Sequence, residues 1–358
     1  MSTIAHLTTS HHAIPLGAGR GGSGATRVDL VIVTVEDSDG GTGTGFTFGL
    51  TGGAGAARHL LENDLRAAVT GTRLDHWPAT WEALWNVTHR LGRGHALPAV
   101  SALDIAVHDL LAVERGLPLY RYLGAHADSV PIYGSGRATH AMSDAELVEG
   151  AERYAADGIH AVKLRAGVLG LERDVARVAR VRSALGDATR IMVDCNERLG
   201  LADAIWLARR LADLGVYWIE EPLRSDDVEG HRQLAARGGL PVAVGEHLLG
   251  RFEFAQYLQR RAASVLQPDP PLCGGVTEWR RIAAIAEAGS AVLSPHFLPE
   301  LNVHLALSAP NCSYIEHFPL LDGVLLETIE ISDGRARPPD RPGHGLRFDP
   351  DALRAHRV

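Results

Sequence analysis

From about residue 130 onward the chain alternates short apolar runs with amphipathic segments of helical length, and this alternation constrains the fold most strongly. Such a pattern is typical of βαβ units, in which helices connect parallel strands and cover the sheet. Leu201–Leu214 repeats apolar residues at three- and four-residue steps, which predicts a helix with one buried face. The apolar runs are Val130–Tyr133, His160–Arg165, Ile191–Asn196, Val216–Glu221, Pro241–His247, Ser264–Asp269, Ala291–His296 and Cys312–His317.

The number of runs separates the two folds that such units form. Periodicity fits a closed barrel and an open doubly wound sheet equally well, but eight runs favour a closed (β/α) barrel. Ser143 and Glu146 have the S-x-x-E spacing of a capping box at the start of the first barrel helix. Glycines stand where the predicted helices should end, at Gly158, Gly186, Gly215 and Gly289. We therefore expect an α/β protein built on a TIM barrel.

The residues before and after the barrel predict a smaller domain of mixed structure. Val28–Glu36 and Gly45–Gly49 are expected to be two strands around a turn, and a helical stretch follows from about Ala54 to Leu123. The tail contains a strand-like segment, Val324–Ile331, and then a turn-rich stretch. The predicted organisation is an N-terminal α+β capping domain over 1–125, a barrel domain over 126–318 and a C-terminal segment over 319–358 that returns to the capping domain.

Composition excludes several classes of protein. The 358 residues are 46% hydrophobic and 22% charged, with a formal net charge of −8, which is ordinary for a globular protein. Because no Lys/Arg run is present, we expect no nucleic-acid partner. We expect no membrane span, since no window approaches about 20 apolar residues. Three scattered cysteines, Cys195, Cys273 and Cys312, fit neither a disulfide framework nor a Cys-based zinc site, so the sequence predicts a cytoplasmic protein.

Polar residues gather at the carboxyl ends of the apolar runs, where a (β/α) barrel forms its active site. They are Lys163 and Arg165, Asp194 and Asn196, Glu220 and Glu221, Glu246 and His247, Asp269, His296, and Glu316 and His317.

Three of these carboxylates recur at the spacing of one βα unit. Asp194, Glu220 and Glu246 are each 26 residues apart, so they can converge on one point. Converging carboxylates repel each other at neutral pH unless a cation neutralises them, and hard oxygen ligands suit Mg²⁺ or Mn²⁺ better than zinc. The alternative is that each carboxylate is a solvated loop residue or forms a separate ion pair. The regular spacing favours a metal site.

Two further pairs could carry acid/base or anion-binding roles. Lys163 and Arg165 alternate by two on one predicted strand, so both side chains point toward the barrel mouth. His296 lies one strand beyond Asp269, whose carboxylate could fix the tautomer of the imidazole and raise its basicity. The alternatives are a surface Lys/Arg pair and a helix-capping histidine.

Together these segments resemble the enolase superfamily, specifically its mandelate racemase subgroup, which includes muconate lactonizing enzymes, over nearly the whole chain. The matching segments are Lys163-x-Arg165, Val193–Asn196, Trp218–Pro222, Gly245–His247, Gln267–Asp269, Ser294–His296 and Ile315–His317, with Ser101–Ala106 and Leu117–Tyr120 before the barrel. The resemblance implies a modified (β/α)7β barrel with an N-terminal capping domain. His11–Thr26 and Phe46–Gly53 would be mobile capping loops that close over the substrate, and the protein would be a homo-oligomer.

The resemblance also implies the role of each site residue. Asp194, Glu220 and Glu246 would bind Mg²⁺, and the choice of Glu220 over Glu221 follows from the resemblance alone. His296 with Asp269 would be the acid/base dyad, and Glu316 would hydrogen-bond the carboxylate of the substrate. Removing a proton alpha to a carboxylate requires stabilisation of an enediolate, which Mg²⁺, Lys163 and a protonated Glu316 could supply.

One residue departs from the usual pattern of the subgroup. Arg165 stands where the second lysine of Lys-x-Lys commonly acts as a base, and arginine stays protonated at physiological pH. Arg165 is therefore a poor base and a good anion clamp. Since a racemase exchanges protons on two faces and a dehydratase needs one base, this residue favours dehydration with His296 as base and then acid.

The sequence therefore predicts a Mg²⁺-dependent dehydratase that converts a sugar acid, an aldonate or aldarate, into a 2-keto-3-deoxy acid. Ser294–Phe297 and Asn302–His304 are also similar to sugar-acid dehydratases of the subgroup. A racemase or epimerase of a 2-hydroxy acid, with Lys163 as second base, is the alternative, and a non-catalytic metabolite-binding barrel is a third. Asn196 and His247 are expected to contact the substrate, and Arg20 and Arg137 are further candidates.

Overall fold

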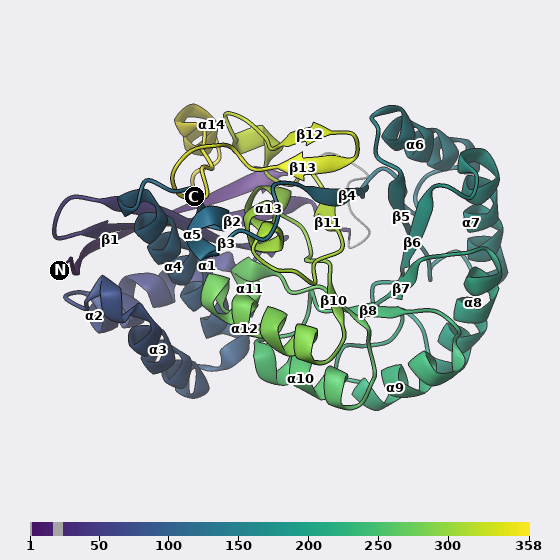
Figure 1. Cartoon of the computed structure of the whole chain (residues 1–358), viewed down its shortest axis with the longest axis horizontal. Coiled ribbons are helices and arrows are strands. Elements are labelled where there is room, and N and C mark those ends of the chain that lie inside the picture. Colours follow the sequence, from purple (N-terminus) through teal and green to yellow (C-terminus); the bar gives the residue numbers. More distant parts are fainter. Residues whose placement is uncertain (1, 17–23) are drawn as a thin grey trace.

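The computed structural model describes residues 2–16 and 24–358 and has two connected parts (Figure 1). A barrel occupies one side of the molecule, and an antiparallel sheet with several helices occupies the other. The glycine-rich segment 17–23, with the candidate Arg20, lies outside the described residues.

The N-terminal sheet has the order β1-β2-β3, formed by β1 (Ile4–Pro15), β2 (Arg27–Asp37) and β3 (Thr42–Leu50). The sequence prediction missed β1, because polar residues interrupt its alternation and its burial pattern is irregular. The two segments expected to be capping loops also begin inside strands. Residues 11–15 belong to β1 and residues 46–50 to β3, so only their later parts can form loops.

Helices follow and accompany this sheet. They are α1 (Ala54–Leu60), η1 (Leu61–Leu65), α2 (Arg66–Val69), η2 (Leu74–His76), α3 (Trp77–Leu91), α4 (Arg93–Glu114) and α5 (Leu119–Leu123). Of these, α1, η1 and α4 contact the strands of the sheet, and α3 and α5 pack against α4. β3 approaches α4 closely, and Gly43 and Gly45 make this possible. A Cβ atom added at Gly45 would lie 2.0 Å from the carbonyl oxygen of Ala102, so only glycine fits there.

α4 is the one helix in the described part of the chain that is long and apolar enough to cross a membrane. However, 83% of its most apolar 18-residue window is buried inside the protein. This burial is what the central helix of a folded core requires.

The barrel confirms the alternation predicted from the sequence. Each predicted run overlaps a strand: β4 (Val130–Gly134), β5 (Ala161–Arg165), β6 (Arg190–Asp194), β7 (Trp218–Glu220), β8 (Val242–Val244), β9 (Val265–Leu266), β10 (Val292–Leu293) and β11 (Ile315–His317). Neighbouring strands pair in parallel from β4 to β10, and β11 pairs with β4. A parallel bridge between Leu293 and Cys312 joins β10 to the chain entering β11 and closes the barrel. The fold is therefore a (β/α)7β barrel with an N-terminal cap.

The connecting helices form the outer layer of the barrel (Figure 1). The capping box predicted at Ser143 and Glu146 is present at the start of α6. Gly186 and Gly289 are the C-terminal caps of α7 and α12. The helices are α6 (Asp144–Ala156), α7 (Leu171–Leu185), α8 (Leu201–Asp213), α9 (Val228–Arg237), α10 (Arg251–Gln259), α11 (Pro270–Cys273), α12 (Gly275–Ala288) and α13 (Pro299–Leu307).

The strands β6 to β10 end earlier than their apolar runs, and the chain turns sharply after several of them. Asn196, Glu221 and Phe297 have positive φ angles of 43°, 38° and 49°, which are uncommon for residues other than glycine. Such backbone strain tends to be retained at functional sites. These residues lie beside the polar side chains that the sequence analysis selected.

The C-terminal segment contacts both parts of the molecule. It contains η3 (Asp322–Val324), β12 (Glu330–Ser332), β13 (Arg335–Arg337) and α14 (Pro350–Ala355), and β13 pairs antiparallel with β4. The strand expected at Val324–Ile331 forms only at its last two residues. Further along, the backbone N–H of His344 donates to Asp109 of α4 (2.7 Å), and the N–H of Val358 donates to the carbonyl of His11 (3.0 Å).

Glu300, in the first turn of α13, provides a test of this packing. Its side chain is buried, one carboxyl oxygen has no hydrogen-bond partner, and burial raises its pKa from 4.5 to about 7. The protonated form is therefore favoured in the folded state. Its contribution to the free energy of unfolding is present at low pH and is lost as pH rises from 4.5 to 7. We expect Glu300→Gln to gain stability over wild type across this window, by roughly 2–3 kcal/mol at pH 8.

Urea unfolding at pH 4.5 and pH 8 measures this difference. Glu287→Gln, at an exposed position on α12, is the control and should show no such change with pH. Equal stability of Glu300→Gln and wild type at both pH values would contradict the prediction.

Candidate active site

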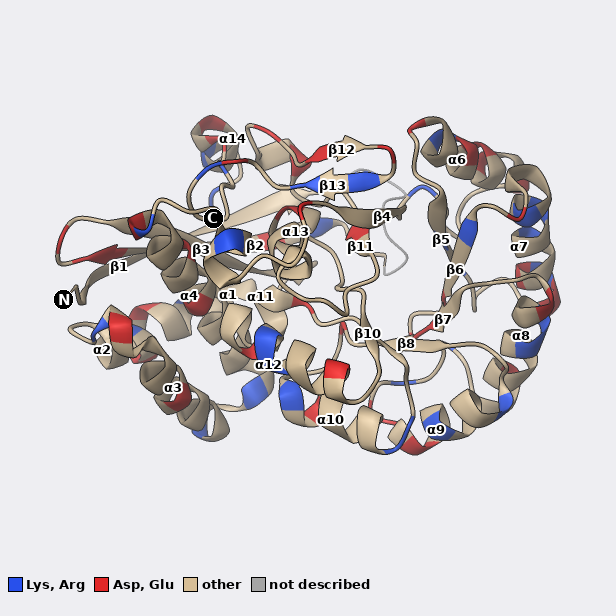
Figure 2. Cartoon of the chain, viewed as in Figure 1, with Lys and Arg blue, Asp and Glu red and all other residues tan. Residues whose placement is uncertain are grey.

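The predicted strand-end residues meet at one end of the barrel. Asp194 at the end of β6, Glu220 at the end of β7 and Glu246 just after β8 each offer a ligand oxygen, and these oxygens lie within 4.8 Å of one another. Asp194 and Glu220 are buried, and the Glu246 side chain is 15% exposed. Figure 2 shows basic residues on β5 and acidic residues on β7 and β11 inside a barrel whose other charges lie mainly on the outer helices.

Two cations from β5 contact these carboxylates. Lys163 Nζ lies 2.6 Å from Glu220 Oε1 and 3.5 Å from Asp194 Oδ2. Arg165 forms an ion pair with Asp194. Burial opposes both charges, but the carboxylates outweigh it and raise the pKa of Lys163 and of Arg165 above their usual ranges. Both side chains are therefore cationic hydrogen-bond donors in this arrangement.

Lys163 and Arg165 do not fully neutralise the cluster of Asp194, Glu220 and Glu246. Burial, together with repulsion from Asp194 and other carboxylates, raises the pKa of Glu220 to about 8 although Lys163 opposes the shift. A divalent cation would relieve this repulsion. Three clustered oxygen donors, two of them buried, match the ligands that Mg²⁺ and Mn²⁺ prefer. The donor set therefore fits such an ion.

A histidine–carboxylate pair lies next to this group. His296 Nδ1 donates to Asp269 Oδ2 (2.9 Å), which leaves Nε2 directed at Glu246 Oε2, 3.3 Å away. Burial opposes the charge of His296, but Glu246 and Asp269 raise its pKa to about 9. The pair is therefore an oriented acid/base group whose Nε2 faces the carboxylate cluster. A cation bound by Glu246 would offset the charge that raises this pKa and leave Nε2 able to take up a proton.

Glu316 on β11 connects the cations with the histidine segment. Its Oε1 lies 2.9 Å from Lys163 Nζ, and its Oε2 accepts the backbone N–H of Phe297 (3.0 Å). Burial opposes its charge, but Lys163 and His296 outweigh it and lower the pKa of Glu316 to about 2. The structure thus holds Glu316 as a carboxylate, whereas the sequence analysis assumed a protonated donor. The difference arises because Lys163 contacts it directly.

The two residues expected to contact substrate have protein partners here. Asn196 Oδ1 accepts from Arg165 (2.7 Å), and the backbone N–H of Asn196 donates to Asp194 Oδ1 (2.9 Å). His247 Nδ1 donates to Glu221 Oε2 (2.8 Å), while its side chain is 47% exposed. Asn196 therefore orients Arg165 and Asp194, and His247 is held by Glu221 with about half of its side chain exposed.

Glu197, Glu221 and His247 form a second group whose ligand atoms lie close enough to hold a metal. Burial lowers the pKa of His247, but hydrogen bonding to Glu221 outweighs it and raises the pKa to about 10. An imidazolium already paired with Glu221 is a poor metal ligand, because a ligand nitrogen must be deprotonated. Glu197, Glu221 and His247 therefore form an ion-pair cluster, which was not predicted from the sequence.

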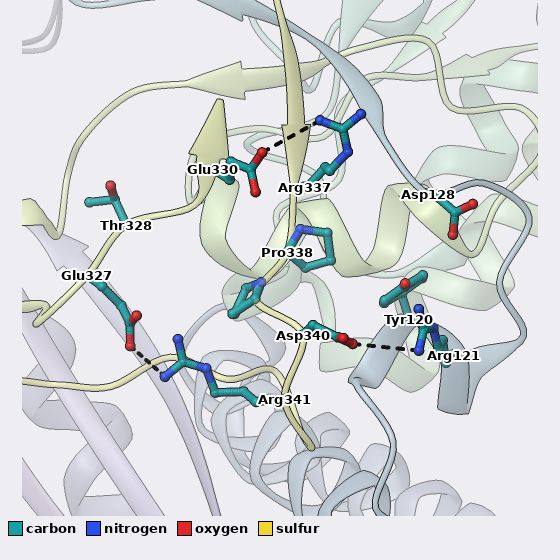
Figure 3. A pocket seen from close by; sticks show the side chains of 11 residues that line it. Tyr120, Arg121, Asp128, Glu327, Thr328, Glu330, Arg337, Pro338, Asp340 and Arg341 are labelled. Atoms are coloured by element: carbon teal, nitrogen blue, oxygen red, sulfur yellow. Dashed lines mark ion pairs between the residues drawn. The ribbon is translucent and has the colours of Figure 1, made fainter. Parts of the chain in front are cut away.

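Other candidates lie elsewhere. Arg137 pairs with Asp157 at 3.1 Å and its guanidinium lies over the Tyr154 ring, so it does not join the strand-end group. A cavity of about 630 Å³ lies between α5 and the C-terminal segment (Figure 3), but none of the predicted site residues lines it. Its arginines are already paired: Arg341 with Glu327, Arg121 with Asp340 and Arg337 with Glu330.

A capped (β/α)7β barrel with clustered carboxylates beside an oriented histidine is the architecture of a metal-assisted enzyme that moves a proton. The family model of the mandelate racemase/muconate lactonizing enzyme N-terminal domain matches residues 5–124, and the enolase C-terminal domain-like model matches residues 146–352. The chain belongs to the enolase superfamily, in its mandelate racemase subgroup.

Curated relatives include sugar-acid enzymes. The chain is 36% identical over 310 residues, 86% of each sequence, to the 3,6-anhydro-alpha-L-galactonate cycloisomerase of Streptomyces coelicolor. It is 37% identical over 262 residues to the L-talarate/galactarate dehydratase of Salmonella typhimurium, covering 73% of this chain and 66% of that protein.

Solved structures agree with this placement. A racemase from Streptomyces coelicolor with bound magnesium superposes with a TM-score of 0.94 at 34% identity, covering 99% of this chain and 100% of that one. The L-talarate dehydratase of Polaromonas sp. JS666, complexed with Mg and L-glucarate, gives a TM-score of 0.93 at 33% identity, covering 100% of this chain and 98% of that one.

Proposed function

We propose that the protein is a Mg²⁺-dependent carbon–oxygen lyase that dehydrates a sugar acid, an aldonate or aldarate, to a 2-keto-3-deoxy acid. The observation that carries the proposal is the geometry of His296, whose Nδ1 is fixed by Asp269 and whose Nε2 faces the carboxylate cluster. The magnesium-bound relatives and the sugar-acid dehydratases among them support the same chemistry.

The residues divide the reaction between them. Mg²⁺ held by Asp194, Glu220 and Glu246 would stabilise the negative charge that develops on the substrate carboxylate. Lys163 is placed to donate a hydrogen bond to the same developing charge, because it is held protonated beside Glu220 and Glu316.

His296 transfers the proton. Nε2 takes the proton from carbon 2, and the electron pair of that C–H bond forms the enediolate. The enediolate then expels the hydroxyl group of carbon 3, to which the His296 imidazolium returns the proton as water leaves. The resulting enol tautomerises to the 2-keto-3-deoxy acid, as its O–H proton is lost to water and carbon 3 takes a proton from water. One base that acts next as an acid is sufficient for the abstraction and elimination steps.

Cycloisomerisation is the second candidate, because the cycloisomerase relative aligns with 86% of each chain. The proton-abstraction step would be the same. If the oxygen leaving carbon 3 is tethered to another carbon of the sugar acid, no water is released and the product is an isomer. The two reactions therefore differ in the leaving group and not in the base.

Racemisation or epimerisation receives less support. It requires a second base on the other face of the substrate, and the candidates are Lys163 and Arg165. Glu220 and Glu316 hold Lys163 protonated, and Arg165 is paired with Asp194. A guanidinium does not act as a base at neutral pH.

Proton NMR in D₂O with Mg²⁺ tests the proposed function against a panel of aldonates, aldarates, anhydro sugar acids and simple 2-hydroxy acids. Loss of the alpha-proton signal with growth of 2-keto-3-deoxy signals and release of water in the mass balance supports dehydration. A 2-keto-3-deoxy product formed from an anhydro sugar acid without loss of water identifies a cycloisomerase. Alpha-proton exchange with inversion and no elimination would overturn the lyase proposal.

Arg165 gives a prediction on stereochemistry. Wild type should act on only one configuration at carbon 2, with a preference of roughly 10²-fold or more, because only the His296 face carries a base. Arg165→Lys places a residue that can lose its proton on the other face, and it should introduce deuterium into the opposite epimer. Arg137→Lys, outside the site, is the control. Equal exchange of both epimers by wild type would contradict this reading of Arg165.

A further inference from the structure

The segment that carries His296 has an unusual backbone. Phe297 and Leu298 follow it with φ angles of 49° and 42°, so two consecutive residues other than glycine adopt the left-handed conformation. This conformation is energetically unfavourable for residues other than glycine and persists only where neighbouring groups hold it. The turn lies beyond the end of β10, so its carbonyl groups need hydrogen-bond donors from outside the strand.

Asn302, on α13, supplies them. Its Nδ2 donates to the carbonyl of His296 (2.9 Å) and to the carbonyl of Phe297 (2.7 Å). Both partners are acceptors only, so the amide nitrogen, and not the oxygen, must face them. The Asn302 side chain is completely buried and therefore reaches the turn without being open to solvent.

The turn held by Asn302 orients two site groups at once. The Phe297 ring stacks on the His296 imidazole with the ring centroids 3.7 Å apart. The backbone N–H of Phe297 donates to Glu316 Oε2 (3.0 Å). A shift of this peptide would therefore move the imidazole and withdraw a donor from Glu316 together.

We propose that Asn302 is a positioning residue of the active site, which holds the His296–Phe297 peptide so that His296 and Glu316 keep their reactive geometry. The inference rests on the proposed function for its kinetic readout. Asn302 touches neither the carboxylate cluster nor His296 Nε2 in any hydrogen bond of the described residues, so it acts through the backbone alone.

Asn302→Ala removes both hydrogen bonds and is the main test. We expect kcat to fall about 10- to 100-fold with KM within about twofold, because misplacement of a catalytic group by about 1 Å can cost 10²-fold. The Mg²⁺ affinity should stay within about twofold, since the ligand carboxylates lie on other strands. Asn302→Ser keeps one hydroxyl donor, should recover part of kcat, and serves as the second variant if the alanine variant is unstable at the assay temperature.

Asn311 offers a matched control. Its Nδ2 also bridges two backbone carbonyls, of Ala283 in α12 and of Ala291 just before β10, each at 3.3 Å, but neither carbonyl belongs to a site residue or its neighbour. Asn311→Ala should lower the melting temperature and leave kcat near wild type. A fall in melting temperature for Asn302→Ala with an unchanged kcat would overturn the positioning role and leave a structural one.

A second readout does not depend on turnover. The His296 imidazole signal in histidine-labelled protein can be assigned by its loss in His296→Asn. It should shift or broaden in Asn302→Ala and remain in place in Asn311→Ala. If wild type converts no sugar acid, the proposed function fails while this signal still decides the inference. An unchanged His296 signal in Asn302→Ala would overturn it.

Discussion

His296→Asn is expected to lower kcat by about 10³-fold with the identified substrate, which is within the 10²- to 10⁴-fold range of general acid–base catalysis. Asparagine keeps a polar side chain of similar reach but has no nitrogen that can take a proton. The same residue acts twice in the proposed reaction, so its loss blocks both proton abstraction and departure of water. The buried bond to Asp269 Oδ2 is lost or weakened as well.

Alpha-proton exchange in D₂O distinguishes this loss from a failure to bind substrate. His296→Asn should show no exchange into recovered substrate, while isothermal titration should show substrate and Mg²⁺ binding within a few-fold of wild type. His160→Asn, at an exposed position before β5, is the control. Full turnover in His296→Asn would exclude His296 as the base and return the role to Lys163.

The barrel could be predicted because its strands are buried on both faces. Segments such as Ala161–Arg165 and Arg190–Asp194 are therefore nearly continuous apolar runs that end in charge. The carboxyl ends of parallel strands meet at one edge, so a constant spacing of 26 residues was enough to bring Asp194, Glu220 and Glu246 together. For these three residues, the spacing along the chain was therefore sufficient to predict which side chains meet in the fold.

The strand β1 and the tail could not be predicted in the same way. β1 lies in an antiparallel sheet with irregular burial, and its histidines and threonines hide the period of two. The tail depends on distant partners, such as the pairing of β13 with β4 and the bond from His344 to Asp109. No local pattern records which distant strand or carboxylate will supply a partner.

The same limit applied within the site. Residue types and spacing selected Lys163, His296 and Glu316, but the ionisation of each depends on its contacts. The 2.9 Å contact with Lys163 is what keeps Glu316 a carboxylate. The role of Asn302 rests on a left-handed turn that could not be predicted from the sequence, because Phe and Leu rarely adopt the left-handed conformation found at Phe297 and Leu298.

Removal of Mg²⁺ should have the second large effect. After treatment with EDTA, we expect turnover to fall by about 10³-fold or more and to return with Mg²⁺ or Mn²⁺, because no other group can stabilise an enediolate among buried carboxylates to the same degree. The ion should also stabilise the fold, since it binds the assembled carboxylates of the native state. At a concentration 100 times its Kd the gain is about 2.7 kcal/mol.

Two neighbouring glutamates make this prediction specific. Glu220→Gln removes one carboxylate of the predicted metal group and should reduce the Mg²⁺-dependent rise in melting temperature severely. Glu221→Gln changes the adjacent residue, which faces His247, and should retain that rise. Thermal unfolding with and without Mg²⁺ measures both. The reverse result, with Glu221 required and Glu220 dispensable, would move the metal to the group of Glu197, Glu221 and His247.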